Sequence, residues 1–235
     1  MTKKIHRFIW DFGNQVGDSI EITDKETVHQ IKNVLKLKIG EKIILSNGNG
    51  GEVEGVLKEV RKTTIMSIDS RQTVEPLPTT SLLVAIVKRD NWEWIVQKAV
   101  EIGITKIVPL VTERTIKTNL NYERLNKIAK EAAEQSGQSY LPNIVAAMDF
   151  EDAIKAVKIG EVNIFLEKDG VKMKKPLERR DETVNIWVGP EGGWSEEEVE
   201  TAKSKQMQVV SLGVSTLRAE TAAITGAYFF SHFSV

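Results

Sequence analysis

Hydrophobic and polar positions divide the chain into two parts with different periodicity. In the first part, apolar runs at residues 5–10, 43–45, 53–57 and 64–68 have the length of strands. Thr23 and Glu26 form a capping-box pattern ahead of apolar residues at helical spacing, which predicts a helix. The Asn-Gly-Asn-Gly-Gly turn at residues 47–51 predicts a hairpin, because Asn and Gly tolerate positive φ. Together these elements predict a small β-barrel or curled sheet.

The pattern changes after residues 74–79, where Pro76 and Pro78 interrupt any strand ladder and indicate a linker. Beyond the linker, strands are predicted at residues 81–87, 107–111, 144–146, 162–166, 184–188 and 209–212. Helices are predicted between them, at residues 90–102, 122–135, 150–157, 195–203 and 217–233. This alternation predicts an α/β domain around a parallel sheet, with ligands at the carboxyl ends of its strands. We therefore expect two domains, residues 1–73 and 74–235.

Composition narrows the class of protein. A chain of 235 residues with 41% hydrophobic and 28% charged residues is typical of a globular protein. No apolar run approaches the roughly 18 residues that a membrane span needs, and residues 1–4 lead into strand-like sequence rather than a signal peptide. We expect a cytoplasmic protein without membrane contact. Cysteine is absent, which excludes disulfides, thiolate metal sites and a cysteine nucleophile, and the histidines show no metal spacing. We expect no metal.

The net charge of −1 gives no global sign of a nucleic-acid partner. Basic residues nevertheless cluster at Lys32, Lys36, Lys38 and Lys42, and again at Lys168, Lys172, Lys174, Lys175, Arg179 and Arg180. Such clusters are usually solvated faces, so at this point RNA binding and simple solvation both remain open.

Two glycine-containing segments, residues 187–195 and 212–222, carry the candidate chemistry. Each begins where a predicted strand ends and leads into a predicted helix. Gly189 to Gly193 has neither dinucleotide nor phosphate-loop spacing, but the backbone groups of such a turn can bind the edge of a nucleobase. The alternative is a structural turn before a helix capped by Ser195 and Glu198. Glu191, a carboxylate between glycines, favours a functional loop.

The start of the last predicted helix holds a second candidate group. Glu220 is favoured there by the helix dipole and so has a structural explanation. Arg218 opposes the dipole, which indicates that it holds a carboxylate or a phosphate. Trp92, Trp94 and Trp187 are predicted core residues, whereas Trp194 can pack or stack on a base.

Taken in chain order, the two segments resemble the RsmE family of ribosomal RNA methyltransferases in the SPOUT superfamily. Further blocks resemble the same family and cover nearly the whole chain: residues 6–8, 29 with 34–41, 94–103, 107–110, and 131–137 with Pro142. The chain departs from the family pattern at Gln138, Ser215 and Ala219, where Arg, Arg and Thr are usual.

The resemblance implies a PUA-like RNA-binding β-barrel followed by a SPOUT-type α/β domain with a trefoil knot. It also implies a homodimer that uses S-adenosylmethionine to methylate N3 of a uridine in 16S ribosomal RNA, either as naked RNA or in the small ribosomal subunit. The absence of cysteine agrees with N3, because methylation at C5 usually requires a cysteine that adds to the base. A ribose 2′-O-methyltransferase of the same superfamily and a non-catalytic RNA-binding protein remain alternatives.

The resemblance also assigns site residues. The cofactor site is expected to comprise the knot loops and the loop after Leu166: Leu166, Glu167, Val188, Gly189, Pro190, Glu191, Gly192, Gly193, Leu212, Gly213, Leu217, Arg218 and Thr221. We hypothesise that Arg218 stabilises the uridine anion or its phosphate, and that Glu220 orients Arg218 or assists proton removal. RNA phosphates are expected at Arg7, Lys32, Lys36, Lys38, Lys172 and Arg218.

Overall fold

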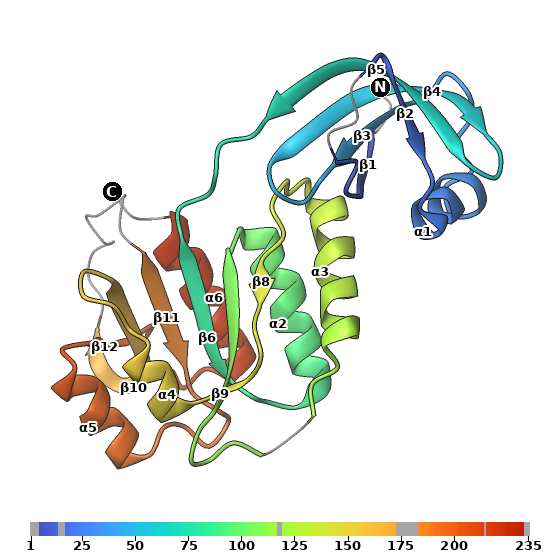
Figure 1. Cartoon of the computed structure of the whole chain (residues 1–235). Coiled ribbons are helices and arrows are strands. Elements are labelled where there is room, and N and C mark those ends of the chain that lie inside the picture. The colour runs from blue at the N-terminus through green and yellow to red at the C-terminus, as the bar shows by residue number, and fades with distance from the viewer. Residues whose placement is uncertain (1–4, 14–16, 117–118, 173–182, 214, 233–235) are drawn as a thin grey trace. The chain divides into compact units, whose positions relative to one another are not determined.

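The computed structural model describes residues 5–13, 17–116, 119–172, 183–213 and 215–232 (Figure 1). The chain divides into two compact units. The first unit comprises Met1–Pro76 together with Ala133–Leu141, and the second comprises Leu77–Ala132 and Pro142–Val235. A short segment from the middle of the chain therefore packs with the N-terminal residues.

The first unit is built on a five-stranded sheet. Its strands are β1 (His6–Ile9), β2 (Ser19–Ile22), β3 (Lys42–Ser46), β4 (Gly51–Val60) and β5 (Thr64–Thr73), in the order β1-β3-β4-β5-β2. The β1–β3 pair is parallel and the other pairs are antiparallel. A buried cluster that includes Phe8, Ile20, Leu45, Leu57 and Met66 forms its core. Strand β2 was not expected from the sequence.

The helix of the first unit begins one residue later than its capping pattern predicts. Helix α1 (Lys25–His29) continues into a π-helical turn (Gln30–Val34). Its N-cap is Asp24, whose carboxylate accepts a hydrogen bond from the backbone N–H of Thr27 at 2.8 Å. The prediction of Thr23 as the cap is therefore wrong, because the carboxylate of the next residue satisfies the free N–H group of the first turn.

The predicted hairpin joins β3 to β4. The side-chain oxygen of Asn47 accepts hydrogen bonds from the N–H groups of Asn49 and Gly51, both at 2.9 Å. Gly48 and Gly50 adopt φ values of 76° and 86°, which the turn requires.

The second unit contains a seven-stranded sheet. Its strands are β6 (Thr80–Ala85), β7 (Lys106–Val111), β8 (Asn143–Ile144), β9 (Met148–Asp149), β10 (Val162–Lys172), β11 (Val184–Val188) and β12 (Gln208–Ser211). The order is β12-β10-β11-β6-β7-β8, with β9 also paired to β7, and the described pairs are parallel. The predicted parallel α/β architecture is confirmed.

Helices cover both faces of this sheet (Figure 1). They are α2 (Arg89–Ile102), α4 (Phe150–Lys155), α5 (Glu196–Ser204) and α6 (Ala219–His232). Helix α3 (Tyr122–Ser136) begins in the second unit, and its residues from Ala133 onward belong to the first. Phe165 and Trp187 project from the strands into one cluster with Phe150 of α4 and Ala202 of α5. On the other face, α6 packs over β11 and β6, and α2 packs along α6. Because successive side chains of a strand point to opposite faces of the sheet, each strand contributes residues to the hydrophobic packing on both faces.

The helix ends and the tryptophans agree with the sequence predictions in part. Ser195 and Glu198 form the predicted capping box of α5, and Gly103 ends α2 with a left-handed φ of 94°. The N-cap of α2 is Lys88 without a side-chain hydrogen bond, and the helix begins at Arg89, one residue before its predicted start. Trp92 and Trp187 are fully buried as predicted, whereas Trp94 is 43% exposed and is not a core residue.

Two features are absent from the residues that the structure describes. None of the helices there is long and apolar enough to cross a membrane. No group of three or more histidine or acidic side chains in the same residues could hold a metal ion.

Candidate functional site

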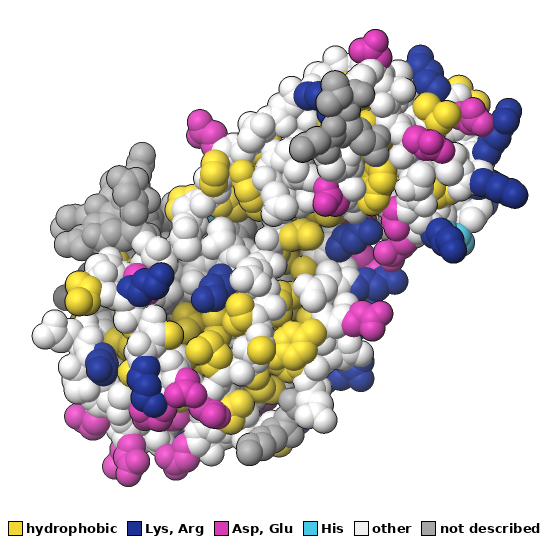
Figure 2. All heavy atoms as spheres, viewed as in Figure 1, with side chains coloured by type: hydrophobic (Ala, Val, Ile, Leu, Met, Phe, Trp, Pro, Cys, Tyr) yellow, Lys and Arg dark blue, Asp and Glu magenta, His cyan; other side chains and the backbone are white. Residues whose placement is uncertain are grey.

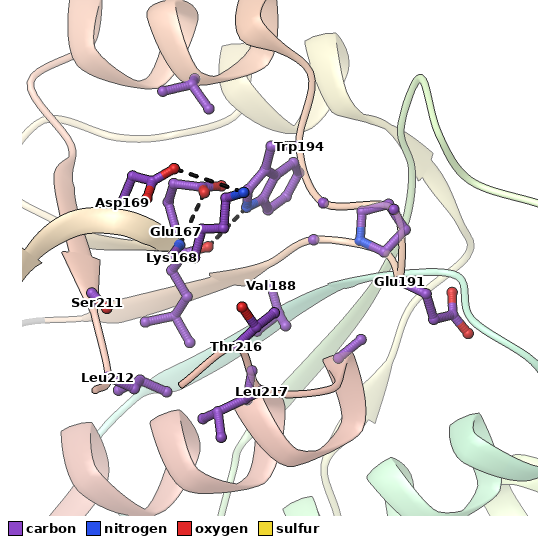
Figure 3. A pocket seen from close by; sticks show the side chains of 18 of the residues that line it. Glu167, Lys168, Asp169, Val188, Glu191, Trp194, Ser211, Leu212, Thr216 and Leu217 are labelled. Carbon is purple, nitrogen blue, oxygen red and sulfur yellow. Dashed lines mark hydrogen bonds and ion pairs between the residues drawn. The ribbon is translucent and has the colours of Figure 1, made fainter. Parts of the chain in front are cut away.

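An open pocket of about 800 Å³ lies over the three neighbouring strands β12, β10 and β11 (Figure 3). Its wall consists mainly of residues 166–169 within β10, residues 188–196 from the last residue of β11 onward, and residues 210–219, without residue 214, from the end of β12 onward. The carboxyl ends of parallel strands are where α/β sheets bind ligands, as the sequence pattern predicts.

The glycine turn after β11 is held by its own backbone and by Trp194. The N–H group of Gly193 donates to the carbonyl of Pro190 at 2.9 Å, and Gly193 has a positive φ of 71°. The ring of Trp194 stacks on Phe165 with ring centroids 4.3 Å apart, and its indole N–H donates to the carbonyl of Leu166 at 2.9 Å. Trp194 is 5% exposed, so it packs rather than offering a face for a base.

The segment after Leu166 is a bulge within a longer strand, not the loop that the sequence predicts. Leu166 and Val171 both pair with Val210 of β12, so residues 167–170 leave the ladder. The backbone of Val210 lies so close to Gly170 that a Cβ atom there would overlap it. Because the strand pairs again after the bulge, Glu167, Lys168 and Asp169 are presented to the pocket beside Trp194 (Figure 3).

The segment after β12 supplies an apolar surface. Val188, Leu212 and Leu217 line the pocket, and Thr216 lies between Val188 and Leu217 in the view of Figure 3. Within the described chain, the backbone groups of Leu212, Thr216 and Leu217 make no hydrogen bonds. A Cβ atom at Gly213 would meet nothing within 4 Å. Free backbone groups beside an apolar surface suit a flat heterocycle such as adenine, which needs both stacking and edge recognition.

The predicted catalytic residues lie at the start of α6. Arg218 is exposed, lines the pocket and precedes the helix, where its carbonyl accepts the N–H group of Ala222 at 2.8 Å. Glu220 is 9% exposed and lies in the first helical turn without lining the pocket. Its Oε2 atom is buried and has no hydrogen-bond partner in the described chain. No ion pair joins the two side chains among the contacts of the described residues.

All the predicted cofactor residues except Thr221 line the pocket: Leu166, Glu167, Val188, Gly189, Pro190, Glu191, Gly192, Gly193, Leu212, Gly213, Leu217 and Arg218. The carboxylate of Glu191 points away from the other labelled side chains (Figure 3). The turn therefore offers its backbone to the pocket more than this carboxylate.

The lysines predicted to bind RNA are on the surface. Lys32, Lys36 and Lys38 are exposed in the first unit, where Figure 2 shows basic side chains near α1. The same stretch exposes the aliphatic side chains of Val34 and Ile39, at 61% and 66%. Lys172 is exposed at the end of β10, whereas Lys174, Lys175, Arg179 and Arg180 lie outside the described residues.

Arg7 has a different environment from these lysines. Its guanidinium forms an ion pair with Glu52, and the two side chains are 16% and 3% exposed. The hydroxyl of Ser139 donates to the same carboxylate. Burial lowers the pKa of the Arg7 guanidinium, because a cation is less favourable away from water. Arg7 thus connects β1, β4 and the segment 133–141 of the first unit.

Two parts of the pocket were missed by sequence reasoning. One face of α5 contributes Glu196, Val199, Glu200 and Lys203, a helical spacing that the sequence displays. The other is Arg114, which follows β7 and donates to the carbonyl of Gly192 at 3.0 Å. Its position after a parallel strand was an available signal.

The turn after β7 is also tied to α5 through Glu198. This carboxylate is 7% exposed and accepts the N–H group of Glu113 at 3.0 Å through one oxygen. Its other oxygen accepts the N–H group of Ser195 at 2.8 Å. One buried capping residue therefore fixes two walls of the pocket relative to each other.

Comparisons with known proteins agree with this geometry. A family model described as the RNA methyltransferase domain matches residues 74–230, and one described as the RNA methyltransferase PUA domain matches residues 22–65. The ribosomal RNA small subunit methyltransferase E of Rickettsia conorii is 35% identical over 218 residues, covering 89% of this chain and 88% of the relative. That of Bacillus subtilis is 30% identical over 222 residues, covering 85% and 84%. The crystal structure of the Neisseria gonorrhoeae enzyme bound to S-adenosylmethionine has a TM-score of 0.87, with 26% identity and 95% of both chains covered.

Proposed function

The chain belongs to the family of the ribosomal RNA small subunit methyltransferases E, and on this basis we propose that it methylates N3 of a uridine in 16S ribosomal RNA, with S-adenosylmethionine as the methyl donor. Membership confirms the expected fold class, a PUA domain and a SPOUT-type α/β domain. The observation that carries the proposal is the pocket along β10 and at the ends of β11 and β12. Among the described residues it combines backbone groups without hydrogen bonds, an apolar surface and an arginine without an acidic partner.

The residues present fit S-adenosylmethionine. Val188, Leu212 and Leu217 offer an apolar surface to its adenine, and the free backbone groups of Leu212 and Leu217 are suited to the polar edge of that base. Glu167 offers a carboxylate to the hydroxyl or ammonium groups of the cofactor. When bound, the cofactor supplies a methyl group on a positively charged sulfur.

Arg218 and Glu220 are the groups proposed to act on the RNA. N3 of uridine loses its imide proton before it is methylated, so negative charge develops on the base. Arg218 has no acidic partner in the described chain and lines the pocket, so its guanidinium is free to stabilise that charge or the adjoining phosphate. The carboxylate of Glu220 is proposed to accept the proton or to orient Arg218. The target base must be unpaired or flipped, because N3 lies on its Watson–Crick edge.

The first unit is proposed to hold the RNA outside the pocket. Lys32, Lys36 and Lys38 are exposed cations suited to phosphates, as is Lys172 of the second unit. Arg7 is less suited, since Glu52 already neutralises it. We further propose that the protein is a cytoplasmic homodimer, as the resemblance to its family implies.

Nucleoside analysis tests the reaction directly. Small-subunit RNA and assembled small subunits are each incubated with the protein and S-adenosylmethionine, digested to nucleosides and examined by mass spectrometry. We expect 3-methyluridine to appear only when both protein and cofactor are present. A 2′-O-methylated nucleoside would instead indicate the ribose methyltransferase alternative. A protein that binds RNA, but gives no heat on titration with S-adenosylmethionine, would be a non-catalytic binding module.

A further inference from the structure

Two of the basic side chains that line the pocket have no acidic partner in the described part of the chain. Lys203 pairs with Glu200 at 2.7 Å, and Lys168 lies 3.9 Å from the carboxylate of Asp169. Arg114 and Arg218, in contrast, make no ion pair with any described residue. A cation at a pocket that no described acidic side chain neutralises indicates an anionic ligand. Arg218 already has a proposed role, and Arg114 has none.

Arg114 is held in a defined place. The short turn that carries it is closed by Thr112 and Thr115. Their hydroxyl groups are hydrogen-bonded at 2.8 Å, and the backbone N–H of Thr115 donates to the carbonyl of Thr112 at 3.1 Å. The neighbouring N–H group of Glu113 donates to buried Glu198. These bonds fix the backbone under Arg114, so its side chain is presented from a rigid turn.

Only part of the guanidinium is used by the protein. Its Nη1 atom donates to the carbonyl of Gly192 at 3.0 Å, and its stem lies beside Gly192, where an added Cβ atom would be 3.5 Å away. A guanidinium has five N–H donors in a planar fork, and the others bond to no described residue. The fork can therefore bind a second oxygen group while one arm stays on the glycine turn.

The place of Arg114 favours the RNA over the cofactor as its ligand. Arg114 follows β7, which is separated from β11 by β6. The apolar surface suited to adenine instead consists of Val188 at the end of β11 and of Leu212 and Leu217 after β12. Arg114 therefore reaches the pocket at Glu191 and Gly192, and the Glu191 carboxylate points away from the group of Val188, Leu212 and Leu217 (Figure 3). A ligand that binds Arg114 therefore lies on the side of the pocket formed by Glu191 and Gly192, away from the apolar surface.

We propose that Arg114 binds a phosphate of the RNA next to the target nucleotide while it holds the Gly192 carbonyl, and so positions the RNA against the cofactor turn. This inference rests on the proposed function, since it takes RNA as the substrate. It adds a phosphate-binding residue from a strand that contributes nothing else to the pocket, and it connects the RNA to the turn proposed to bind S-adenosylmethionine.

The test separates RNA binding from cofactor binding and from turnover. Binding of transcribed small-subunit RNA is measured at several salt concentrations for the wild type, R114A, R114K and R124A. Arg124 is a matched control, an arginine of the second unit that pairs with Glu93 at 3.1 Å and does not line the pocket. Binding of S-adenosylmethionine is measured separately by calorimetry.

We expect R114A to bind RNA about tenfold more weakly, and the slope of log affinity against log salt to fall by about one. We expect R114K to keep the slope but to recover only part of the affinity, because an ammonium lacks the planar fork. R124A should match the wild type, and R114A should keep its affinity for S-adenosylmethionine within about twofold.

An unchanged salt slope in R114A, or a loss confined to S-adenosylmethionine binding, would overturn the proposal, and so would wild-type RNA binding that is insensitive to salt. These measurements need no methyl transfer. A wild-type protein that binds RNA through Arg114 but gives no 3-methyluridine would therefore overturn the proposed function and leave this inference standing.

Discussion

The indole N–H of Trp194 donates to the main-chain carbonyl of Leu166 at 2.9 Å, and this bond joins the glycine turn after β11 to β10 at the residue before its bulge. Trp187 makes a chemically similar bond, from its indole N–H to the side-chain oxygen of Asn163 at 3.0 Å. Both rings are buried, but only Trp194 lines the pocket. A comparison of variants at Trp194 and Trp187 can therefore distinguish the effect of an indole hydrogen bond on stability from its effect on the pocket.

Replacement of Trp194 by Phe should weaken both stability and cofactor binding. The Leu166 carbonyl loses its donor, so we expect the free energy of unfolding to fall by about 1–3 kcal/mol. The turn also loses its link to β10, so affinity for S-adenosylmethionine, measured by calorimetry, should fall several-fold. Trp187→Phe is the control, with a similar loss of stability and unchanged cofactor affinity. Equal cofactor affinity in the two variants would contradict the link.

Replacement of Gly213 by Ala should block the cofactor and leave the fold intact. A Cβ atom there meets nothing within 4 Å, and Gly213 is not among the glycines with positive φ, so we expect little change in thermal stability. Because Gly213 lines the pocket, we expect the added methyl group to occupy space that the cofactor needs. Affinity for S-adenosylmethionine should then fall at least about tenfold, or 1.4 kcal/mol. Gly193→Ala is the opposite case, since its φ of 71° makes the substitution strained and about 1–2 kcal/mol destabilising. Normal cofactor affinity in Gly213→Ala would remove this residue from the site.

Replacement of Arg218 by Ala should abolish methyl transfer with little change in cofactor affinity. Loss of a group that stabilises developing charge typically lowers kcat by about 100- to 1,000-fold. Turnover is measured as 3-methyluridine formed per protein, and cofactor affinity by calorimetry. Arg218→Lys should recover part of the rate because it keeps the charge. Full turnover by Arg218→Ala would contradict the role assigned to this side chain.

Much of the fold follows from the sequence because buried strands leave a strong signal. Strand β6 is buried along its whole length, and its residues from Leu82 onward read as an apolar run that continues to Val87. Strand β2 was missed because four residues with alternating exposure give little periodicity. The cap of α1 was misplaced by one residue because Thr23 and Asp24 are both good caps, and only the geometry selects Asp24. Threading of a knot has no local signal at all and is expected only from the family.

The candidate site was predictable where it is local and not where it depends on distant residues. The glycine turns are visible in the sequence because each lies between a strand and a helix. Arg114 was missed because its partner Gly192 lies 78 residues further along the chain, and no spacing rule connects them. The bulge at residues 167–170 was missed for a related reason, since it is defined by pairing with Val210 of β12.

Replacement of Arg7 by Ala tests whether this residue binds RNA or stabilises the fold of the first unit. Its ion pair with Glu52 is largely buried, and removal of one partner of a buried pair typically destabilises by about 3–5 kcal/mol. We therefore expect faster hydrogen exchange of the amides of β1 and β4 and a lower unfolding temperature. Because Arg7 is already neutralised, the salt slope of RNA binding should stay unchanged, whereas Lys36→Ala should lower it.

Joint replacement of Arg7 by Met and Glu52 by Leu should restore part of the stability, since it leaves no unpaired buried charge. If Arg7→Ala instead kept its stability and lost a salt-dependent RNA contact, Arg7 would be an RNA-binding residue as the sequence predicts.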